Sequence, residues 1–336
     1  MYRAAQIAGK IASPTAFAHL AANTRANHLQ PLLKIGVDLM GNDNAPRVLL
    51  NALRELSLPS TVQLVGIGTP EFERNAPPFQ YVSAPEVIGM EEHPLVALRR
   101  KKNASVNVGM RLLREGQIHA FVSAGNTGAL VSSAKMILAT LPGILRPCLL
   151  TLMPTKKNPI AVLDVGANVE VKAAHLVQFA LIGAAFQKTR GIPRPTVGLL
   201  NIGSEAQKGT SELRLAYHEL QKKAVFQFAG NIEGKNVFDG NIDVLVTDGF
   251  TGNVFLKTAE GIVSLILDRL QLPASELKAF QSLHYAEYPG ALLAGIRGIV
   301  IKCHGYSTPK GFTNAVLGAI ELAKEGFVQK LLNDLR

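Results

Sequence analysis

Short apolar runs alternate with longer stretches of helical periodicity along most of the chain. The apolar runs have the length of strands and are bounded by Gly, Pro, Asn or Asp. Between them, apolar residues recur at i, i+3 and i+4, as in amphipathic helices. The predicted strands are 33–39, 61–66, 79–82, 119–123, 147–152, 159–163, 196–200, 242–246 and 298–302. The predicted helices are 45–57, 104–115, 128–140, 171–188, 210–223, 252–270 and 308–325.

This alternation predicts an α/β protein with a largely parallel sheet that is covered by helices. The sequence contains no internal repeat, no low-complexity tract and no linker long enough to separate independent domains. We therefore expect a single α/β domain over residues 34–330.

Four predicted strand-to-helix junctions carry glycine together with asparagine: FVSAGNTGAL, VLDVGANVEV, LLNIGSEAQKGTSEL and VLVTDGFTGNVFL, beginning at residues 121, 162, 199 and 244. In a parallel sheet such junctions lie at the carboxyl ends of the strands, so we expect all four to converge on one crevice. The helices that follow would present free N–H groups and the positive end of their dipoles, which favours a bound anion such as phosphate. For any single junction, an ordinary turn is the alternative.

The charge balance favours an acidic partner. The chain has 35 Lys and Arg residues against 25 Asp and Glu residues, which gives a formal net charge of +10. Nucleic acid, an anionic membrane surface, a phosphorylated ligand and an acidic protein all fit this excess. The densest basic cluster is Arg99-Arg100-Lys101-Lys102, for which a solvated helix end is the alternative.

Residues 1–33 differ in composition from the rest of the chain. They are rich in alanine, contain Arg3, Lys10 and Arg25, and have no acidic residue. An organellar transit peptide, a disordered bacterial extension and a start site placed too early all fit this composition. The two cysteines, Cys148 and Cys303, make no disulfide framework and favour a reducing compartment. No window approaches about 18 uninterrupted apolar residues, so we expect no transmembrane span.

Several catalytic signatures are missing from the sequence. The order Lys208-Gly209 does not fit a phosphate-binding P-loop, and GIG at 66–68 lacks the third glycine of a dinucleotide fingerprint. Neither HExxH nor CxxC is present, which argues against a zinc site, and no GxSxG elbow marks a serine hydrolase. Cys303 is better explained as a small buried hydrophobe than as a nucleophile. Anion-binding loops without these signatures suggest an enzyme whose substrate, such as inorganic phosphate, is itself the nucleophile.

Seven motifs follow one another in the order GVDLMGNDNAP, PLVALRRKKNAS, SAGNTGAL, LDVGANVE, NIGSEAQKG, DVLVTDGFTGNVFLKTAEG and EYPGALLAGIRGIVIKCHG. Through them the chain resembles, from about residue 34 to 325, the phosphate acyltransferases of bacterial phospholipid synthesis. The resemblance implies a three-layer α/β/α sandwich with a mostly parallel, Rossmann-like sheet. It also implies a cytoplasmic homodimer with peripheral membrane contact and no metal or cofactor. The implied reaction transfers a fatty acyl group from acyl-acyl carrier protein to inorganic phosphate and yields acyl phosphate.

The sequence departs from the family pattern at several points. Ser204 stands where relatives have a first glutamate, so only Glu205 keeps its acid, and Asn42 replaces a glycine. The stretch over 268–287 is shorter than in relatives, where it carries amphipathic helices implicated in membrane contact. This shortening weakens the expectation of membrane association. The extension over 1–33 has no family counterpart.

The implied chemistry assigns roles to residues in these loops. Phosphate must be held beside a thioester carbonyl, and the developing oxyanion needs preorganised donors. Lys208 is the first candidate for binding phosphate, Asn253 offers an amide, and His304 is a candidate proton donor to the leaving sulfur. Capping, turn or buried structural roles are the alternatives for all of these residues. The candidate substrate-binding residues are Asn126, Thr127, Gly128, Asp164, Asn168, Glu205, Asp248 and Gly252.

The basic cluster gains a second interpretation from the resemblance. Arg99, Arg100, Lys101 and Lys102 are expected to steer an acidic acyl carrier protein. Four acids are candidates for orienting Lys208 or the loop backbones, or for relaying a proton. They are Asp38, Asp164, Glu205 and Asp248.

Three other functions compete with this interpretation. A phosphotransacetylase-like enzyme acting on acyl-coenzyme A could use the same loops. A non-catalytic scaffold for carrier protein and membrane would not need the Lys208 loop. Nucleic-acid binding would call for aromatic interleaving or a known motif, and neither lies near the basic cluster.

Overall fold

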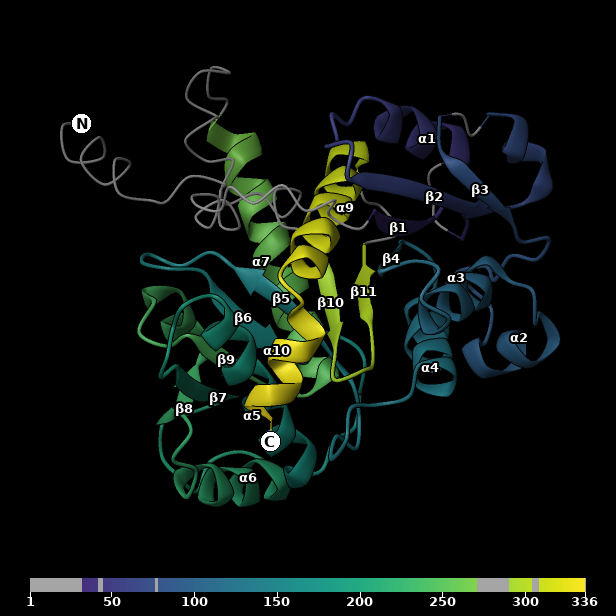
Figure 1. Cartoon of the computed structure of the whole chain (residues 1–336). Helices are drawn as coiled ribbons and strands as arrows, with labels where there is room; N and C mark the ends of the chain where they lie inside the picture. Colours follow the sequence, from purple (N-terminus) through teal and green to yellow (C-terminus); the bar gives the residue numbers. More distant parts are fainter. Residues whose placement is uncertain (1–31, 42–44, 76–77, 271–289, 304–307, 336) are drawn as a thin grey trace, which may run out of the picture. The chain divides into compact units, whose positions relative to one another are not determined.

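Strands and helices alternate through the residues that the computed structural model describes, which are 32–41, 45–75, 78–270, 290–303 and 308–335. The internal contacts divide the chain into two units (Figure 1). We call residues 148–270 the central unit, and residues 32–147 together with 290–334 the terminal unit. The prediction of one domain over 34–330 stays a prediction. The expected extension over 1–33 lies almost wholly outside the described residues.

The terminal unit is built on six strands in the order β3-β2-β1-β4-β11-β10. Pairing is parallel from β3 to β11, and β10 runs antiparallel to β11. The strands are β1 (Leu33–Asp38), β2 (Val62–Gly68), β3 (Gln80–Ser83), β4 (Ala120–Ser123), β10 (Ala291–Ala294) and β11 (Ile299–Lys302). The α-helices are α1 (Pro46–Arg54), α2 (Pro94–Arg100), α3 (Ser105–Arg114), α4 (Thr127–Ile137), α9 (Pro309–Lys324) and α10 (Phe327–Asp334), with a 3₁₀ turn at Pro70–Asn75.

Helices cover both faces of these strands. Helix α3 packs on β1, β2 and β4 with α4 beside it, whereas α9 packs on β1, β4 and β11 with α1 beside it. The two pairs lie on opposite sides of the strands (Figure 1). Strand β1 is buried from Ile35 to Asp38, as expected for a central strand of a parallel sheet. The expected three-layer α/β/α arrangement is therefore present in this unit.

The central unit has five strands in the order β5-β6-β9-β7-β8. Strands β6, β9, β7 and β8 are parallel, and β5 is antiparallel to β6. Helix α5 packs on β6, β9 and β7, and α6 packs on β7 and β8. The strands are β5 (Cys148–Met153), β6 (Ile160–Leu163), β7 (Thr196–Asn201), β8 (Gln227–Glu233) and β9 (Val244–Val246). The helices are α5 (Ala173–Thr189), α6 (Ser211–Gln221) and α7 (Gly249–Leu270), with a 3₁₀ turn at Gly234–Asp239.

The apolar pattern located the buried elements and missed several smaller ones. Every predicted strand and helix has a counterpart within a few residues, and the expected α/β class is confirmed. Strands β8 and β10 and helices α2 and α10 were not predicted. Strand β8 is a partly exposed edge strand, β10 has only four residues, and α2 and α10 are short. Each therefore carries too little periodic signal to be recognised.

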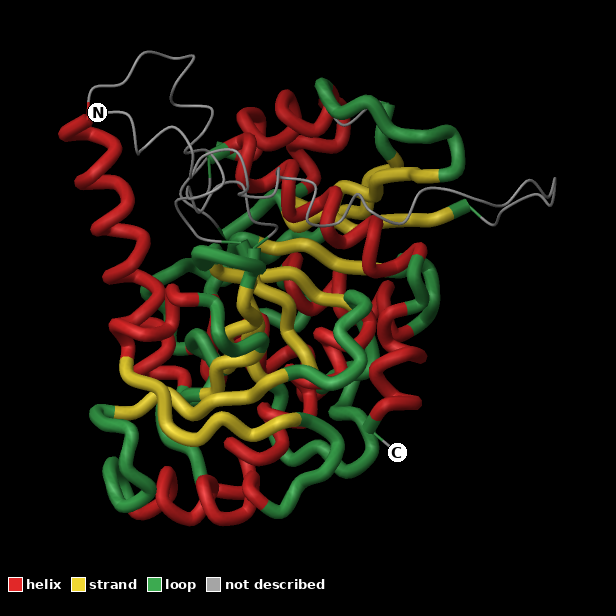
Figure 2. Tube along the Cα trace, turned by 90° about the vertical axis from the view of Figure 1, so that its left-hand side faces the viewer, coloured by secondary structure: helices red, strands yellow, loops and turns green. Residues whose placement is uncertain are grey.

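Helix α7 is unusual among the described helices. It is long and apolar enough, by length and composition alone, to cross a membrane, yet only 6% of its most apolar window is buried. In Figure 2 it is the long helix at the left, which extends clear of the strands of its own unit. Lys257 and Glu260 interrupt the apolar residues of α7, so the helix contains no run of about 18 apolar residues. For this reason the sequence did not predict a membrane span here.

Candidate active site

Three of the four predicted junctions meet at one edge of the central unit. Because β6, β9 and β7 are adjacent and parallel, the loops that follow them leave the sheet at the same side. The loop after β6 touches the start of α7, where the N–H of Gly249 donates to the carbonyl of Asn168 at 2.7 Å. It also touches the start of α6, because Glu212 Oε2 accepts from the N–H of Ala173 at 2.6 Å. These loops therefore form one continuous structure.

Asp164 organises the loop after β6. Its Oδ1 accepts from the N–H groups of Leu149, Gly166 and Ala167, and its Oδ2 accepts from both the N–H and the side-chain amide of Asn168, all at 2.8–3.1 Å. The side chain is fully buried, and burial raises its pKa above the ordinary value despite these donors. Both oxygens are occupied by protein donors, so the geometry fits a scaffold for the loop, with Asn168 as its partner.

The start of α7 is largely satisfied by the protein itself. Asp248 caps the helix, since its carboxylate accepts from the N–H and the hydroxyl of Thr251, both at 2.8 Å. With Gly249 bonded to Asn168, few first-turn N–H groups are left for a ligand. Gly252 is buried where α7 meets β6, and a Cβ there would lie 1.9 Å from the carbonyl oxygen of Asp164. Glycine is thus required at 252 for close approach.

Asn253 lies one residue further along α7 and is exposed. Its side chain lies over Gly166, where a Cβ would come within 3.7 Å of Asn253 Oδ1. Its amide makes no hydrogen bond to any residue that the structure describes. Asn253 is therefore available to contact a substrate beside the loop after β6.

The loop over 202–209 follows β7 and has the clearest features of an anion site. The N–H groups of Gly203 and Ser204 donate to no described residue, although Gly203 is buried. The carbonyl of Glu205 accepts from the N–H of Lys208 at 3.1 Å and from the Asn231 side chain at 2.8 Å. These bonds fix the loop while its first amides stay unpaired.

Lys208 folds back over this loop. A Cβ at Gly203 would lie 3.2 Å from Cγ and 3.4 Å from Cε of Lys208, and 2.8 Å from a carboxylate oxygen of Glu205. Lys208 is exposed, and its ammonium forms no ion pair with any carboxylate among the described residues. A free ammonium beside unpaired amides is the combination that a phosphate dianion requires.

The fourth junction belongs to the terminal unit, so the convergence of all four loops stays a prediction. Here Asn126 caps α4 by accepting from the N–H of Ala129 at 3.0 Å. Its side-chain amide is directed at the carbonyls of Gly89, Met90 and Glu92, at 2.9–3.3 Å. Asn126 therefore acts as a cap and clamp, which was its structural alternative, and its role in binding substrate stays a prediction.

The neighbouring residues Thr127 and Gly128 begin α4 and are half-buried. Gly128 packs against Pro94, whose Cγ would lie 2.6 Å from a Cβ at that position. Their roles as substrate-binding residues stay predictions.

A buried polar cluster lies under the same junction. Ser123 Oγ donates to Asp38 Oδ2 at 2.8 Å and accepts from the N–H of Gly125 at 3.1 Å, while Asp38 Oδ1 accepts from the N–H of Met40 at 3.0 Å. A cavity of about 10 Å³, room for about one water molecule, adjoins Asp38 and Ser123 and also Ser105 at the start of α3. The cluster thus joins the end of β1 to the end of β4.

Burial dominates the electrostatics of this cluster. Burial raises the pKa of Asp38 from 3.8 to about 6, and the hydrogen bonds from Met40, Ser123 and Ser105 only partly offset it. Lys302, paired in register with Ser123 and itself buried, donates to the carbonyls of Ala124 and Cys303. Its charge also lowers the pKa of Asp38, but less than burial raises it.

Ser123, Lys302 and Asn201 were not among the predicted site residues, and Asp38 was predicted only as one of the acids that orient Lys208 or relay a proton. Their shared signal was a polar residue closing an otherwise apolar strand, which is costly unless the side chain is hydrogen-bonded. His304 lies outside the described residues. The pKa of the Cys303 thiol is raised to about 12 by burial, which agrees with a structural role.

The basic cluster divides into two kinds of residue. Lys101 is committed internally, because its ammonium donates to Glu92 and to the carbonyl of Val87, both at 2.6 Å. Arg99 and Arg100, at the end of α2, and Lys102 are exposed. Only these three present a charged surface.

Comparison of the chain with known proteins identifies its family. A family model described as "Fatty acid synthesis protein" matches residues 33–330. The chain belongs to this family. Curated relatives named phosphate acyltransferase include those of Pelotomaculum thermopropionicum, at 42% identity over 90% of this chain and 94% of the relative. The relative from Desulforamulus reducens is 38% identical over 90% of this chain and 98% of its own length. The family is therefore one of acyltransferases in fatty acid and phospholipid synthesis.

Solved structures support the same fold. A phosphotransacetylase from Staphylococcus aureus aligns with a TM-score of 0.60 at 17% identity, covering 87% of this chain and 94% of that chain. A branched-chain phosphotransacylase from Enterococcus faecalis aligns with a TM-score of 0.58 at 14% identity, covering 87% and 99%. At these identities the likeness concerns the fold alone, and it confirms the Rossmann-like α/β class.

Proposed function

We propose that this family member transfers a fatty acyl group from acyl-acyl carrier protein to inorganic phosphate and releases acyl phosphate. The name shared by its relatives and the description of its family support an acyl transfer to phosphate in lipid synthesis. The acyl carrier protein as donor and acyl phosphate as product are the parts that this proposal adds.

The 202–209 loop is the observation that carries the proposal. The loop offers a buried glycine amide without an acceptor in the described structure, with the free ammonium of Lys208 folded over it. In this arrangement Lys208 would hold the phosphate, and the amides of Gly203 and Ser204 would bind its oxygens. Phosphate would bind to the loop in its present conformation, which hydrogen bonds from the side chains of Asn201 and Asn231 already fix.

The reaction follows from holding phosphate beside a thioester. A phosphate oxygen attacks the carbonyl carbon, forming a C–O bond and a tetrahedral oxyanion. The C–S bond then breaks, and the sulfur leaves as a thiolate, which takes a proton from solvent or a nearby acid. Orientation of the two reactants can supply about 7 kcal/mol or more of the barrier. Asn253, exposed and without a hydrogen-bond partner in the described part of the chain, is the side-chain donor on α7 that we assign to the oxyanion.

An assay for acyl phosphate tests this function directly. The purified chain is incubated with phosphate and either acyl-acyl carrier protein or acyl-coenzyme A, and acyl phosphate is trapped as a hydroxamate with hydroxylamine. Phosphate-dependent product with the carrier-protein substrate supports the proposal. Product from acyl-coenzyme A alone would reassign the chain to phosphotransacetylase-like chemistry, and no product from either would support a scaffold.

We also propose that the enzyme is a homodimer in which α7 contacts a second copy. Apolar side chains are exposed along the length of α7. Those that are 49–63% exposed are Phe250, Val254, Ile262, Leu265 and Ile266. Light scattering after gel filtration should give a dimer mass for the native chain and a monomer mass for Leu265→Glu. A monomer mass for both chains, together with vesicle binding that only Leu265→Glu loses, would assign the helix to the membrane instead.

A further inference from the structure

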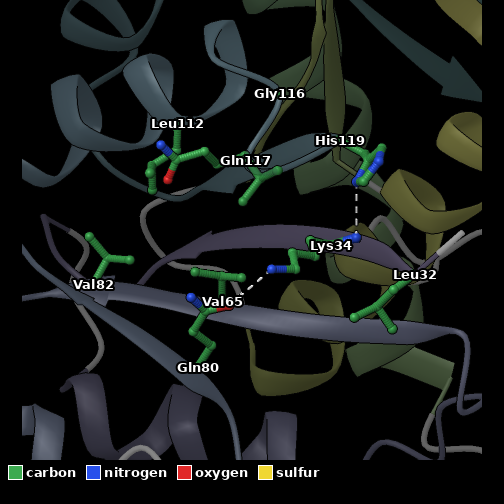
Figure 3. A pocket seen from close by; sticks show the side chains of 10 residues that line it. Leu32, Lys34, Val65, Gln80, Val82, Leu112, Gly116, Gln117 and His119 are labelled. Atoms are coloured by element: carbon green, nitrogen blue, oxygen red, sulfur yellow. Dashed lines mark hydrogen bonds between the residues drawn. The ribbon is translucent and has the colours of Figure 1, made fainter.

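A second pocket lies in the terminal unit, under the end of α3. It has a volume of about 230 Å³, close to the lower limit for ligand sites, so only a small molecule fits. Figure 3 shows its two sides: Leu112, Gly116 and Gln117 from the end of α3 and the turn after it, and Lys34, Val65 and other residues from the strands.

The polar groups of this pocket favour an anion. Lys34 and His119 line it, and no acidic residue does. Among the residues that the structure describes, the ammonium of Lys34 makes only a long hydrogen bond, to Gln80 Oε1 at 3.4 Å (Figure 3). The backbone N–H of Lys34 donates to His119 Nδ1 at 3.0 Å, so the neutral ring carries its proton on Nε2 and can donate it to a ligand. Two donors are thus available on the strand side.

The rest of the lining favours a hydrocarbon chain. Val65 and Val82 on the strands, Ile118, and Leu112 on α3 are apolar, and α3 ends at Arg114, where the carbonyl end of its dipole disfavours negative charge. A ligand that fits this lining has its anionic group at Lys34 and an apolar body that extends between Val82 and Leu112. Inorganic phosphate has no such body.

We propose that this pocket binds a small linear monocarboxylic acid, with its carboxylate at Lys34 and His119 and its chain against Val82 and Leu112. The site is separate from the buried cluster of the same unit. Lys34 and Asp38 lie at opposite ends of β1, about 13 Å apart at ~3.3 Å per residue. None of the lining residues belongs to the loops assigned to acyl transfer, so the ligand would bind without occupying those loops, and the proposal does not depend on the proposed function.

Calorimetric titration of the full chain with sodium hexanoate tests the site. We expect one hexanoate per chain with a dissociation constant of about 1 mM, as befits a small ligand in a small pocket. Lys34→Met keeps the apolar stem and removes the charge, and it should weaken binding at least about tenfold. Lys135→Met, an exposed lysine on α4 that does not line the pocket, is the matched control and should bind as the native chain does.

A second variant keeps Lys34 and offsets its charge with a neighbouring carboxylate. Gln80→Glu places a carboxylate beside the Lys34 ammonium at an exposed strand residue, where it should fold normally and compete with hexanoate. Hexan-1-ol and inorganic phosphate separate the contributions of charge and chain, and both should bind much more weakly than hexanoate. Equal binding of hexan-1-ol or of phosphate, or unchanged hexanoate binding by Lys34→Met and Gln80→Glu, would overturn the proposal.

Discussion

Asn201 fastens both ends of the loop that carries Lys208. Its side-chain amide donates to the carbonyl of Lys208 at 3.1 Å, and its side-chain oxygen accepts from the N–H of Ile202 at 2.8 Å. Gly209 fits beside it with φ +85°, where a Cβ would lie 2.6 Å from Asn201 Oδ1. Because Asn201 is the buried last residue of β7, one side chain ties both ends of the loop to the sheet, while Asn231 of β8 holds the loop between them through the carbonyl of Glu205.

Replacing Lys208 with alanine should remove the charge assigned to phosphate. We expect kcat/KM for phosphate to fall at least about tenfold, because a charge-assisted hydrogen bond contributes ~1.5–3 kcal/mol. Stability should stay unchanged, since the side chain is exposed and forms no ion pair in the described structure. Steady-state kinetics with varied phosphate measure the effect. Lys223→Ala, an exposed lysine of the same unit, is the control, and native kinetics for Lys208→Ala would remove this residue from the mechanism.

Replacing Asn201 with alanine should act on phosphate through Lys208. The loop would lose both fastening hydrogen bonds, so KM for phosphate should rise about tenfold while KM for the thioester changes little. Unfolding by urea should show a loss of ~1–3 kcal/mol, because two hydrogen bonds that contribute ~0.5–1.5 kcal/mol each are removed. A parallel rise in both KM values would show that Asn201 supports the fold generally and does not position Lys208.

Two glycines of α7 provide a matched test of its packing. A Cβ at Gly252 would lie 1.9 Å from the carbonyl oxygen of Asp164, so Gly252→Ala must push the helix away from β6. We expect a loss of ~3 kcal/mol or more in unfolding free energy, as for an overpacked core. Gly261→Ala meets nothing within 4 Å and should instead stabilise the helix by ~1 kcal/mol. Similar urea midpoints for the two variants would contradict the close approach at Gly252.

The sequence predicted the main strands and helices because burial imposes a regular spacing on apolar residues. Helix α1 shows this, with Leu49, Leu50 and Leu53 buried on one face at helical spacing. It also identified the glycine-containing loops, since tight strand-to-helix turns need such residues.

The use of individual side chains could not be predicted in the same way. Asp164 and Asn126 were predicted as substrate ligands, yet each also bonds an atom of a residue distant in sequence, Leu149 for Asp164 and Met90 for Asn126. Conversely, Ser123 gave no sign of its hydrogen bond to Asp38, which is 85 residues away. Local pattern reports burial, whereas hydrogen-bond partners depend on the tertiary fold.

Reversing two exposed charges should affect the carrier-protein substrate selectively. Arg99 and Arg100 end α2 and are exposed, so Arg99→Glu with Arg100→Glu should leave the fold intact. If they steer an acidic carrier, kcat/KM for acyl-acyl carrier protein should fall about tenfold at low salt, with a smaller fall at high salt. Acyl-coenzyme A and the variant Lys135→Glu serve as controls. An equal loss with both thioesters would exclude a docking role.

The buried carboxyl of Asp38 should make folding stability depend on pH. Burial raises its pKa to about 6 in the folded chain from an ordinary value of 3.8, so between these values the native state binds more protons than the unfolded chain. The unfolding free energy contributed by Asp38 therefore falls as pH rises through this window, by ~3 kcal/mol at ~1.4 kcal/mol per pKa unit. The variant Asp38→Asn lacks this titrating group. The contribution of Asp164 is the same in the native chain and in the variant, so it cancels when their unfolding free energies are compared. Urea unfolding at about pH 4 and about pH 7 should thus show the variant gaining roughly 2–3 kcal/mol relative to the native chain. A difference that does not change with pH would mean that Asp38 is ionised in the folded protein throughout, with Lys302 and its hydrogen-bond donors outweighing burial.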